Sequence, residues 1–164
     1  MLQRLGRHAP QRTALLCCDG DDTTAAARPL DYGWLQRAAA RLTARLETVV
    51  EKGDAVGLCF GATTAGAVVG MLAAEAAGCP FLPMDGATQP LQRLCAACHK
   101  ARVGIVLCDA TAEDKALGLG REGACREVIN VSDVLAAVDA DGANPNPNPN
   151  PNPNPNPNPN PNPN

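Results

Sequence analysis

A cysteine pair beside a histidine is the most specific chemical pattern in this sequence. Cys95-Ala-Ala-Cys98-His99 matches Cys-x-x-Cys-His, by which c-type haem is attached, and the pair alone also fits redox and zinc proteins. Leu91, Leu94 and the two cysteines repeat at i, i+3, i+4 and i+7, the spacing of one helix face. We therefore predict that both thiols are core residues. A redox or metal protein using Cys95 and Cys98 is the competing hypothesis, with His8 as the only other histidine.

A second pattern, Gly118-Leu-Gly120-Arg-Glu-Gly123, has the G-x-G-x-x-G spacing of dinucleotide-binding turns. That chemistry requires a strand before the glycines and a helix after them. Here the charged segment Glu113-Asp114-Lys115 precedes them and an apolar, strand-like segment follows. We therefore predict a plain loop over residues 110–126, with a weak helical pattern at best. A Walker-type phosphate loop does not occur in the sequence.

Catalytic machinery is not evident elsewhere in the chain. The sequence has two histidines, and neither a nucleophile–base pair nor a carboxylate dyad can be recognised. We predict no catalytic, cofactor-binding or metal-binding residue. Asn130-Val-Ser132 is a glycosylation sequon, which matters only in a secreted protein.

Composition narrows the class of protein further. The first 16 residues lack an apolar stretch of signal-peptide length, so the eight cysteines are expected to be free thiols in the cytoplasm. The same basic segment also has some features of a mitochondrial presequence. A formal net charge of −3 argues against affinity for nucleic acid or an anionic membrane.

One uncharged run is long enough to cross a bilayer. Residues 55–74 contain no charged side chain and include Gly66-x-x-x-Gly70, a motif of membrane helix pairs. The run is rich in Gly and Ala and poor in large aliphatic residues. We therefore predict a buried strand and a buried helix of a protein that does not enter the membrane.

Elements of both types must position these residues. Thr13–Cys18 and Pro29–Tyr32 are expected to pair as a hairpin, and a helix with apolar Leu35, Ala38, Leu42 and Leu46 follows to about Val50. Its arginines 37, 41 and 45 should be solvated. The remaining expected elements are a strand 55–60, a helix capped by Thr63 or Thr64 and ended at Gly78, a strand 79–84, a helix after Pro90, a strand 103–108, a strand 127–131 and a short helix capped by Ser132. The fold class is therefore α/β, with a mainly parallel, Rossmann-like sheet flanked by helices.

The last 21 residues form a separate region. Residues 144–164 alternate Asn and Pro without exception, which forbids a packed core and favours an extended, disordered segment. We therefore divide the chain into a unit 1–143 and an Asn-Pro tail 144–164. The tail is either a semi-rigid spacer or a translated DNA repeat, because AACCCT is both a telomeric hexamer and a codon pair for Asn-Pro.

Four segments, in order, resemble motifs of the adenylate-forming enzymes, which include acyl-CoA synthetases and the adenylation domains of nonribosomal peptide synthetases. Leu30-Asp-Tyr-Gly-Trp-Leu35 resembles the Leu-x-Tyr-x-x-Leu motif that opens a helix, and Lys52-Gly-Asp-Ala-Val56 resembles a Gly-Asp-x-Val strand start. Ala76-Ala-Gly-Cys-Pro-Phe-Leu-Pro-Met-Asp85 resembles Lys-Ala-Gly-x-x-Tyr-x-Pro-Leu-Asp. Residues 93–109 match the helix and strand that follow. The resemblance covers about residues 8–138, and Gly86 stands where the family usually has proline.

The resemblance implies an AMP-dependent synthetase/ligase, of which this chain would be an incomplete N-terminal part of an adenylation domain. Full-length members use ATP and Mg to activate a carboxylic or amino acid as an acyl-adenylate, and pass it to CoA or to the phosphopantetheine of a carrier protein. Asp85, where many fatty-acid-type members have Asn, favours an amino acid. The family's phosphate loop, which ends Thr-Gly-x-Pro-Lys, is absent from the sequence. We therefore expect this chain to bind no cofactor and to be inactive alone.

A different class of function stays open at this point. The same elements fit a small α/β binding or interaction module that displays its Pro-rich tail to a partner.

Overall fold

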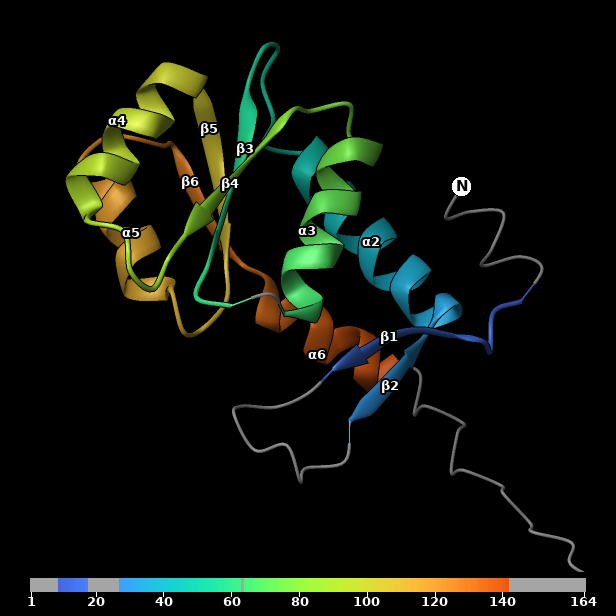
Figure 1. Cartoon of the computed structure of the whole chain (residues 1–164). Helices are drawn as coiled ribbons and strands as arrows, with labels where there is room; N and C mark the ends of the chain where they lie inside the picture. The colour runs from blue at the N-terminus through green and yellow to red at the C-terminus, as the bar shows by residue number, and fades with distance from the viewer. Residues whose placement is uncertain (1–8, 18–26, 63, 142–164) are drawn as a thin grey trace, which may run out of the picture.

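The computed structural model describes residues 9–17, 27–62 and 64–141, and every structural statement below concerns these residues. They form β1 (Thr13–Cys17), β2 (Arg28–Asp31), α2 (Tyr32–Glu47), β3 (Ala55–Phe60), α3 (Ala65–Ala76), β4 (Phe81–Asp85), α4 (Leu91–Ala101), β5 (Val103–Cys108), α5 (Glu113–Arg121), β6 (Glu127–Asn130) and α6 (Val131–Asp141), as Figure 1 shows. The predictions for the Asn-Pro tail and for Thr63 fall outside the described residues.

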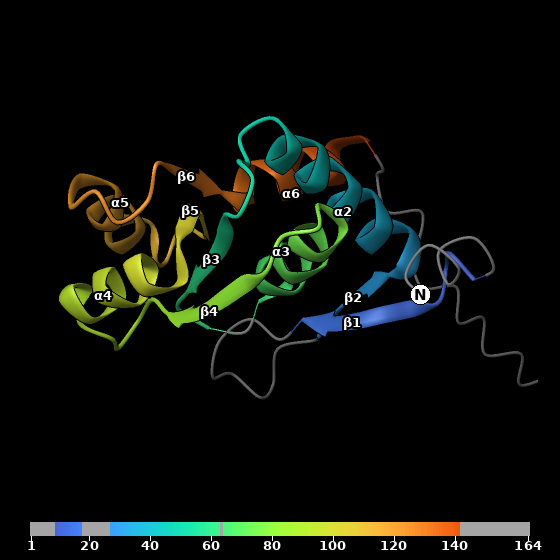
Figure 2. The same ribbon diagram turned by 90° about the horizontal axis from the view of Figure 1, so that it is seen from above.

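Four parallel strands form the central sheet in the order β4-β3-β5-β6. The chain runs outward from β3 to β4, and then returns past β3 to β5. Right-handed crossovers then require α3 on one face of the sheet and α4 and α5 on the other. Figure 2 shows this arrangement, with α2 and α6 on the same face as α3. The predicted α/β class with a parallel sheet is confirmed.

The two central strands are buried along their whole length because helices cover both of their faces. One core lies between the sheet and α2, α3 and α6, and includes Leu42, Ile105 and Leu107. The other lies under α4 and α5, and includes Leu94 and Cys98. The predicted apolar stripe of α2 is buried in the first core, whereas Arg37, Arg41 and Arg45 lie on its exposed side, as predicted.

An antiparallel hairpin of β1 and β2 leads into α2, as predicted. Asp31 ends β2 and caps α2, because its Oδ1 accepts a hydrogen bond from the Trp34 backbone N–H at 2.6 Å. Leu30 and Leu35 are buried on either side of this junction. The Leu-x-Tyr-x-x-Leu segment is therefore a strand-to-helix joint that anchors the hairpin to the first core.

Helix α3 begins at Thr64, whose Oγ1 accepts from the Ala67 N–H, and is followed by Gly78 with a φ of 71°, which favours glycine. Gly66 and Gly70 lie on its buried side. A Cβ at Gly66 would come within 2.8 Å of Val131, and one at Gly70 within 3.2 Å of Leu58. The glycine pair therefore lets α3 approach the sheet and α6 closely. In the part of the chain that is described, no helix is long and apolar enough to span a membrane.

β4 is an edge strand in the described part of the sheet. Pro80 accepts from the Val56 N–H, and the Gly86 N–H donates to the Phe60 carbonyl. Because successive residues of a strand point their backbone groups to opposite sides, Leu82 and Met84 face β3, and Pro83 faces outward. Pro83 therefore removes a hydrogen-bond donor from the outer edge of the sheet, where proline is tolerated.

Two sequence-based predictions were wrong. Residues 110–126 are not a loop, because α5 occupies Glu113–Arg121. Two acidic residues in its first turn favour the helix, and Ala116 and Leu119 bury its inner face. This burial outweighs the cost of two helical glycines, about 1 kcal/mol each. The helix predicted to be capped by Ser132 is instead capped by Asn130, whose Oδ1 accepts from the Ser132 N–H at 2.9 Å.

Candidate functional site

A groove of about 700 Å³ lies at the carboxyl ends of the parallel strands. The order of the sheet reverses between β3 and β5, and in open α/β sheets ligands bind in the crevice beyond the strands at such a reversal. The groove is bounded by the β1–β2 hairpin, the start of α3, α6 and the segment after β5. Its walls are mainly apolar, with a few polar side chains, as is usual for a ligand site.

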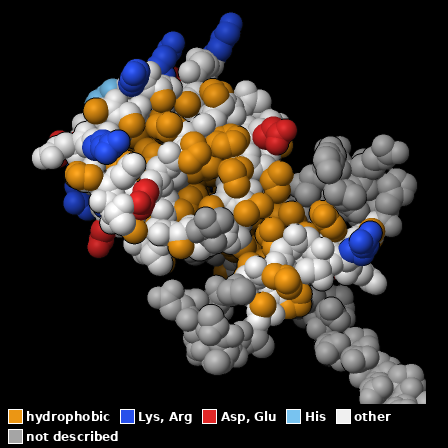
Figure 3. All heavy atoms as spheres, viewed as in Figure 1, with side chains coloured by type: hydrophobic (Ala, Val, Ile, Leu, Met, Phe, Trp, Pro, Cys, Tyr) orange, Lys and Arg blue, Asp and Glu red, His pale blue; other side chains and the backbone are white. Residues whose placement is uncertain are grey.

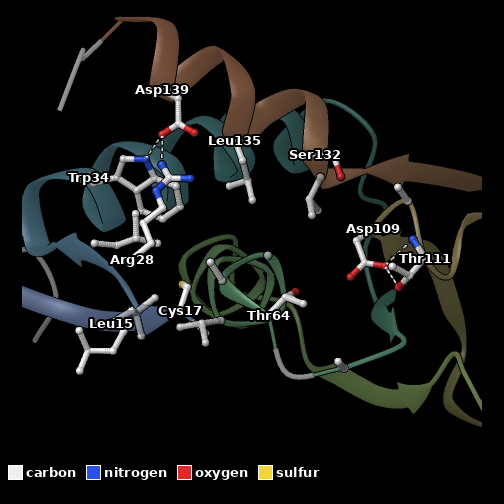
Figure 4. A pocket seen from close by; sticks show the side chains of 18 residues that line it. Leu15, Cys17, Arg28, Trp34, Thr64, Asp109, Thr111, Ser132, Leu135 and Asp139 are labelled. Atoms are coloured by element: carbon white, nitrogen blue, oxygen red, sulfur yellow. Dashed lines mark hydrogen bonds and ion pairs between the residues drawn. The ribbon is translucent and has the colours of Figure 1, made fainter. Parts of the chain in front are cut away.

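Asp139 organises one end of the groove. Its Oδ1 accepts from the Trp34 Nε1–H at 2.8 Å and from the Arg28 guanidinium at 2.9 Å (Figure 4). These three residues come from α6, α2 and β2. The interaction therefore fixes the hairpin and two helices relative to one another at the rim of the groove.

Asp109 organises the other end, directly after β5. Its Oδ1 accepts from the Thr111 hydroxyl at 2.6 Å and from the backbone N–H groups of Thr111 and Ala112 at 3.1 and 3.2 Å (Figure 4). Thr64 and Ser132, at the starts of α3 and α6, line the same region. The Asp109 carboxylate thus stabilises a turn that leads into α5.

Two glycines allow the loops after β3 and β5 to converge here. A Cβ at Gly61 would lie 2.8 Å from the Thr111 hydroxyl, closer than side chains tolerate. Gly66 makes the comparable approach to Val131, at the start of α6. The crevice at the strand reversal therefore depends on close backbone packing from three parts of the chain.

The polar groups of the groove are engaged in holding its walls. Asp109 and Thr64 accept from backbone N–H groups, and Asp139 is paired with Arg28. No buried side-chain nitrogen or oxygen among the described residues lacks a hydrogen-bond partner. The groove can hold a ligand with an apolar body, but it presents no nucleophile with an adjacent base.

Asp85, the last residue of the third family-like segment, also has a structural role. Its carboxylate accepts from the Ala87 and Thr88 N–H groups at 2.8 and 2.9 Å, and from the Thr88 hydroxyl. The Thr88 hydrogen bonds hold the pKa of Asp85 below its usual range. Lys115 on α5 donates to the carbonyls of Ala87 and Gln89, which closes the same turn. Asp85 therefore shapes the end of β4.

The cysteine pair lies away from the groove, on α4. Cys98 is fully buried in the second core, with its Sγ 3.6 Å from the Met84 sulfur, and burial raises its pKa to about 11. Cys95 is half-buried, burial raises its pKa as well, and His99 is exposed. The interpretation of Cys98 as a core residue is confirmed. Across the described ranges, His, Cys, Asp and Glu form no group of three or more that could hold a metal ion.

The other candidate residues are structural as well. Gly118 and Gly120 lie within α5, and Gly123, with a φ of 68°, follows its end. They do not form a phosphate-binding turn between a strand and a helix. Sequence reasoning missed the groove, although Asp109, a polar residue directly after a buried strand, was a usable signal.

Fold and site together define an α/β unit with an open parallel sheet and a crevice at its strand reversal. A sequence model of the AMP-binding enzyme family matches residues 2–164 of this chain. The chain therefore belongs to the AMP-binding enzyme family. This agrees with the resemblance found in the four segments, and it favours an adenylate-forming protein over an unrelated binding module.

Relatives in sequence and in structure agree with this assignment. The chain is 32% identical over 122 residues to AMB antimetabolite synthetase AmbB of Pseudomonas aeruginosa, which covers 74% of this chain. In fold it is similar to MatB of Rhodopseudomonas palustris (TM-score 0.62, 20% identity, 82% of this chain). It is also similar to the fatty acyl-adenylate ligase of Legionella pneumophila (0.66, 16%, 85%) and to the nonribosomal peptide synthetase FmoA3 (0.65, 24%, 82%).

The chain spans only a small part of each of these proteins. It corresponds to 9% of AmbB, 14% of FmoA3, 24% of the Legionella ligase and 27% of MatB. It is thus a partial AMP-binding domain.

Proposed function

We propose that this chain is the outer, scaffolding part of the N-terminal subdomain of an adenylate-forming ligase. The unit comprises residues 1–143, and the Asn-Pro segment 144–164 lies outside it. The family match carries the proposal. The family-like segments support it, because they coincide with joints of the fold: Asp31 caps α2, Gly53-Asp54 precedes β3, and Gly78 ends α3.

In the complete ligase, the proposed reaction has two steps. A carboxylate oxygen of a carboxylic or amino acid attacks the α-phosphorus of ATP, and pyrophosphate leaves, with Mg²⁺ neutralising the phosphate charge. The acyl-adenylate then passes its acyl group to the thiol of CoA or of carrier-protein phosphopantetheine, and AMP leaves. An adenylate is named for one structural relative, FmoA3, which was solved with α-methyl-L-serine-AMP.

The 164-residue chain is proposed to be inactive by itself. A Thr-Gly-x-Pro-Lys loop does not occur in its sequence. The polar side chains of its groove already hold turns and helix starts. The seven cysteines of the described residues are free thiols, which supports a reducing, cytoplasmic location.

ATP–pyrophosphate exchange tests this proposal. The purified chain, incubated with ATP, Mg²⁺ and a panel of amino and carboxylic acids, should give no exchange above a protein-free control. A complete family enzyme such as MatB, with a panel that includes its substrate, serves as the positive control. Acid-dependent exchange by the isolated chain would overturn the scaffolding proposal.

A further inference from the structure

An apolar strip crosses α3 from the hairpin to the edge of the sheet. We call it the α3 strip, and it consists of Leu16, Ala67, Val68, Met71, Phe81 and Pro83. Leu16 is 67% exposed and Phe81 is 41% exposed, while the side chains of α3 in the strip are half-buried. Figure 3 shows hydrophobic side chains gathered over β4, α3 and β1, with charged side chains mostly toward the outline.

The composition of α3 makes this exposure unusual. Eleven of its 12 residues are uncharged, with Glu75 near its end as the exception. A helix that is apolar on all sides is normally buried on all sides in a soluble protein. The sequence therefore predicted a largely buried helix, yet only the face with Val69 and Ala73 is fully buried. Val68 and Met71 lie on the opposite side.

Grooves run along both sides of the strip. Ala65 and Val68 line the groove beside the hairpin, which measures about 700 Å³. Ala67 and Met71 line a second groove, of about 440 Å³, which Pro83 borders on β4. The two grooves and the helix between them form one uneven apolar surface, which side chains of another layer could fill.

The comparisons indicate what kind of layer that is. The structural relatives contain 82–85% of this chain as one part of proteins in which it makes up only 14–27%. The same unit is therefore built into a much larger body in each of them. Pro83 on the outer edge of β4 opposes extension of the sheet by a further strand, so the contact must be made through side chains.

We infer that the α3 strip is the surface on which the remainder of an AMP-binding domain packs, whether that remainder is on the same chain or another. This inference rests on the proposed function. The fitting partner surface is uncharged and carries aliphatic and aromatic side chains that enter both grooves. A second copy of this chain is the competing occupant.

The first test compares the 164-residue chain with Met71→Glu and with a control, Gln92→Glu. Gln92 is an exposed residue of α4, on the opposite face of the sheet, so the control adds the same charge away from the strip. The parent and the control should bind the dye anilinonaphthalene sulfonate and self-associate without fixed stoichiometry as concentration rises. Met71→Glu should lose most of both effects at an unchanged Tm.

Two results of this test would overturn the inference. A parent that binds no dye, or a Met71→Glu variant with a clearly lowered Tm, would mean that the strip is already covered within the chain. A discrete dimer that Met71→Glu dissociates would assign the strip to a second copy.

The second test exchanges the matched segment of AmbB for that of this chain. The parent exchange and its Gln92→Glu variant should be soluble and unfold cooperatively, whereas Met71→Glu should aggregate because a carboxylate is buried in the new interface. An insoluble parent exchange, or a Met71→Glu protein as soluble as the parent, would contradict the inference. A soluble exchange without ATP–pyrophosphate exchange activity would count against the proposed function only, and would leave the packing surface supported.

Discussion

Arg126 holds Asp54 with both terminal nitrogens, across a strand that lies between them. Its Nη2 is 2.6 Å from Oδ2, and its Nη1 is 3.2 Å from Oδ1. Asp54 directly precedes β3 and Arg126 directly precedes β6, with β5 between these strands in the sheet. Asp54 also accepts from the Glu51 N–H at 2.8 Å. The Asp of the Gly-Asp segment therefore ties together the amino ends of the sheet.

Replacing Asp54 should reveal this link as a pH-dependent loss of stability. The Arg126 hydrogen bond is the main cause that lowers the pKa of Asp54 below its ordinary value of 3.8. Its contribution is therefore complete above that value, and is lost as the pH falls through the lower pKa of the folded state. Asp54→Asn should reduce the free energy of unfolding at pH 7 by about 1 kcal/mol, a modest value because Arg126 is 46% exposed.

Urea unfolding at a series of pH values measures this effect. The difference between parent and Asp54→Asn should shrink in strongly acidic solution. Glu47→Gln, at an exposed position near the end of α2, is the control and should change stability little at any pH. A constant difference from pH 7 to strong acid would show that the Asp54 charge is not involved.

Gly104 on β5 should tolerate no side chain, because the pair crosses above it. A Cβ at this position would lie 2.5 Å from the Asp54 carboxyl group, and the Gly104 carbonyl accepts from the Arg126 N–H at 2.8 Å. We expect Gly104→Ala to cost about 1–3 kcal/mol by displacing the pair. In the Asp54→Gly background the same substitution should cost much less. An equal cost in both backgrounds, measured by thermal or urea unfolding, would rule out this steric explanation.

The glycines of α5 should respond in opposite directions. Gly120 lies inside the helix, and a Cβ there would make an ordinary contact, 3.7 Å from Val128. Gly120→Ala should therefore stabilise the protein by about 0.5–1 kcal/mol. Gly123→Ala should destabilise it by about 1 kcal/mol, because its φ of 68° strains a side chain. Similar values for the two substitutions in urea unfolding would support the loop that the sequence alone predicted.

The structure of this segment shows where sequence reasoning failed. Gly118 and Gly120 lower helix propensity, and a single sequence does not show that Leu91 from α4 packs against Gly118. Strands β3 and β5, by contrast, were predictable because unbroken apolar runs are typical of strands covered on both faces. The Asp54–Arg126 pair joins residues 72 positions apart, and the groove depends on similar long-range convergence. Local periodicity carries no information on either.

Thiol labelling should separate the buried cysteines from the accessible ones. Burial raises the pKa of Cys98 to about 11 and that of Cys108 to about 12, so neither supplies thiolate near neutral pH. Cys98→Ala should leave the number of thiols that react in the native state unchanged. It should lower the number in denaturant from eight to seven. Fewer native-state reactive thiols in this variant would show that Cys98 is accessible.

The two sides of α2 should differ sharply in their effect on stability. Leu42 is fully buried in the first core, so Leu42→Ala should cost about 2–5 kcal/mol. Arg37 is exposed on the other side of the helix, and Arg37→Ala should stay within about 0.5 kcal/mol. Urea unfolding monitored by the single tryptophan, Trp34, measures both. Equal losses would mean that the orientation of α2 is wrong.

The proline on the outer edge of β4 also limits how copies of this chain can assemble. A fibril grows when each new strand finds an unbroken row of donors and acceptors on the one before it. Pro83 interrupts that row in the middle of a five-residue strand, so a second β4 laid against it lacks a central bond. A protein with a large apolar surface beside this edge can therefore cluster through side chains and still resist conversion to ordered amyloid.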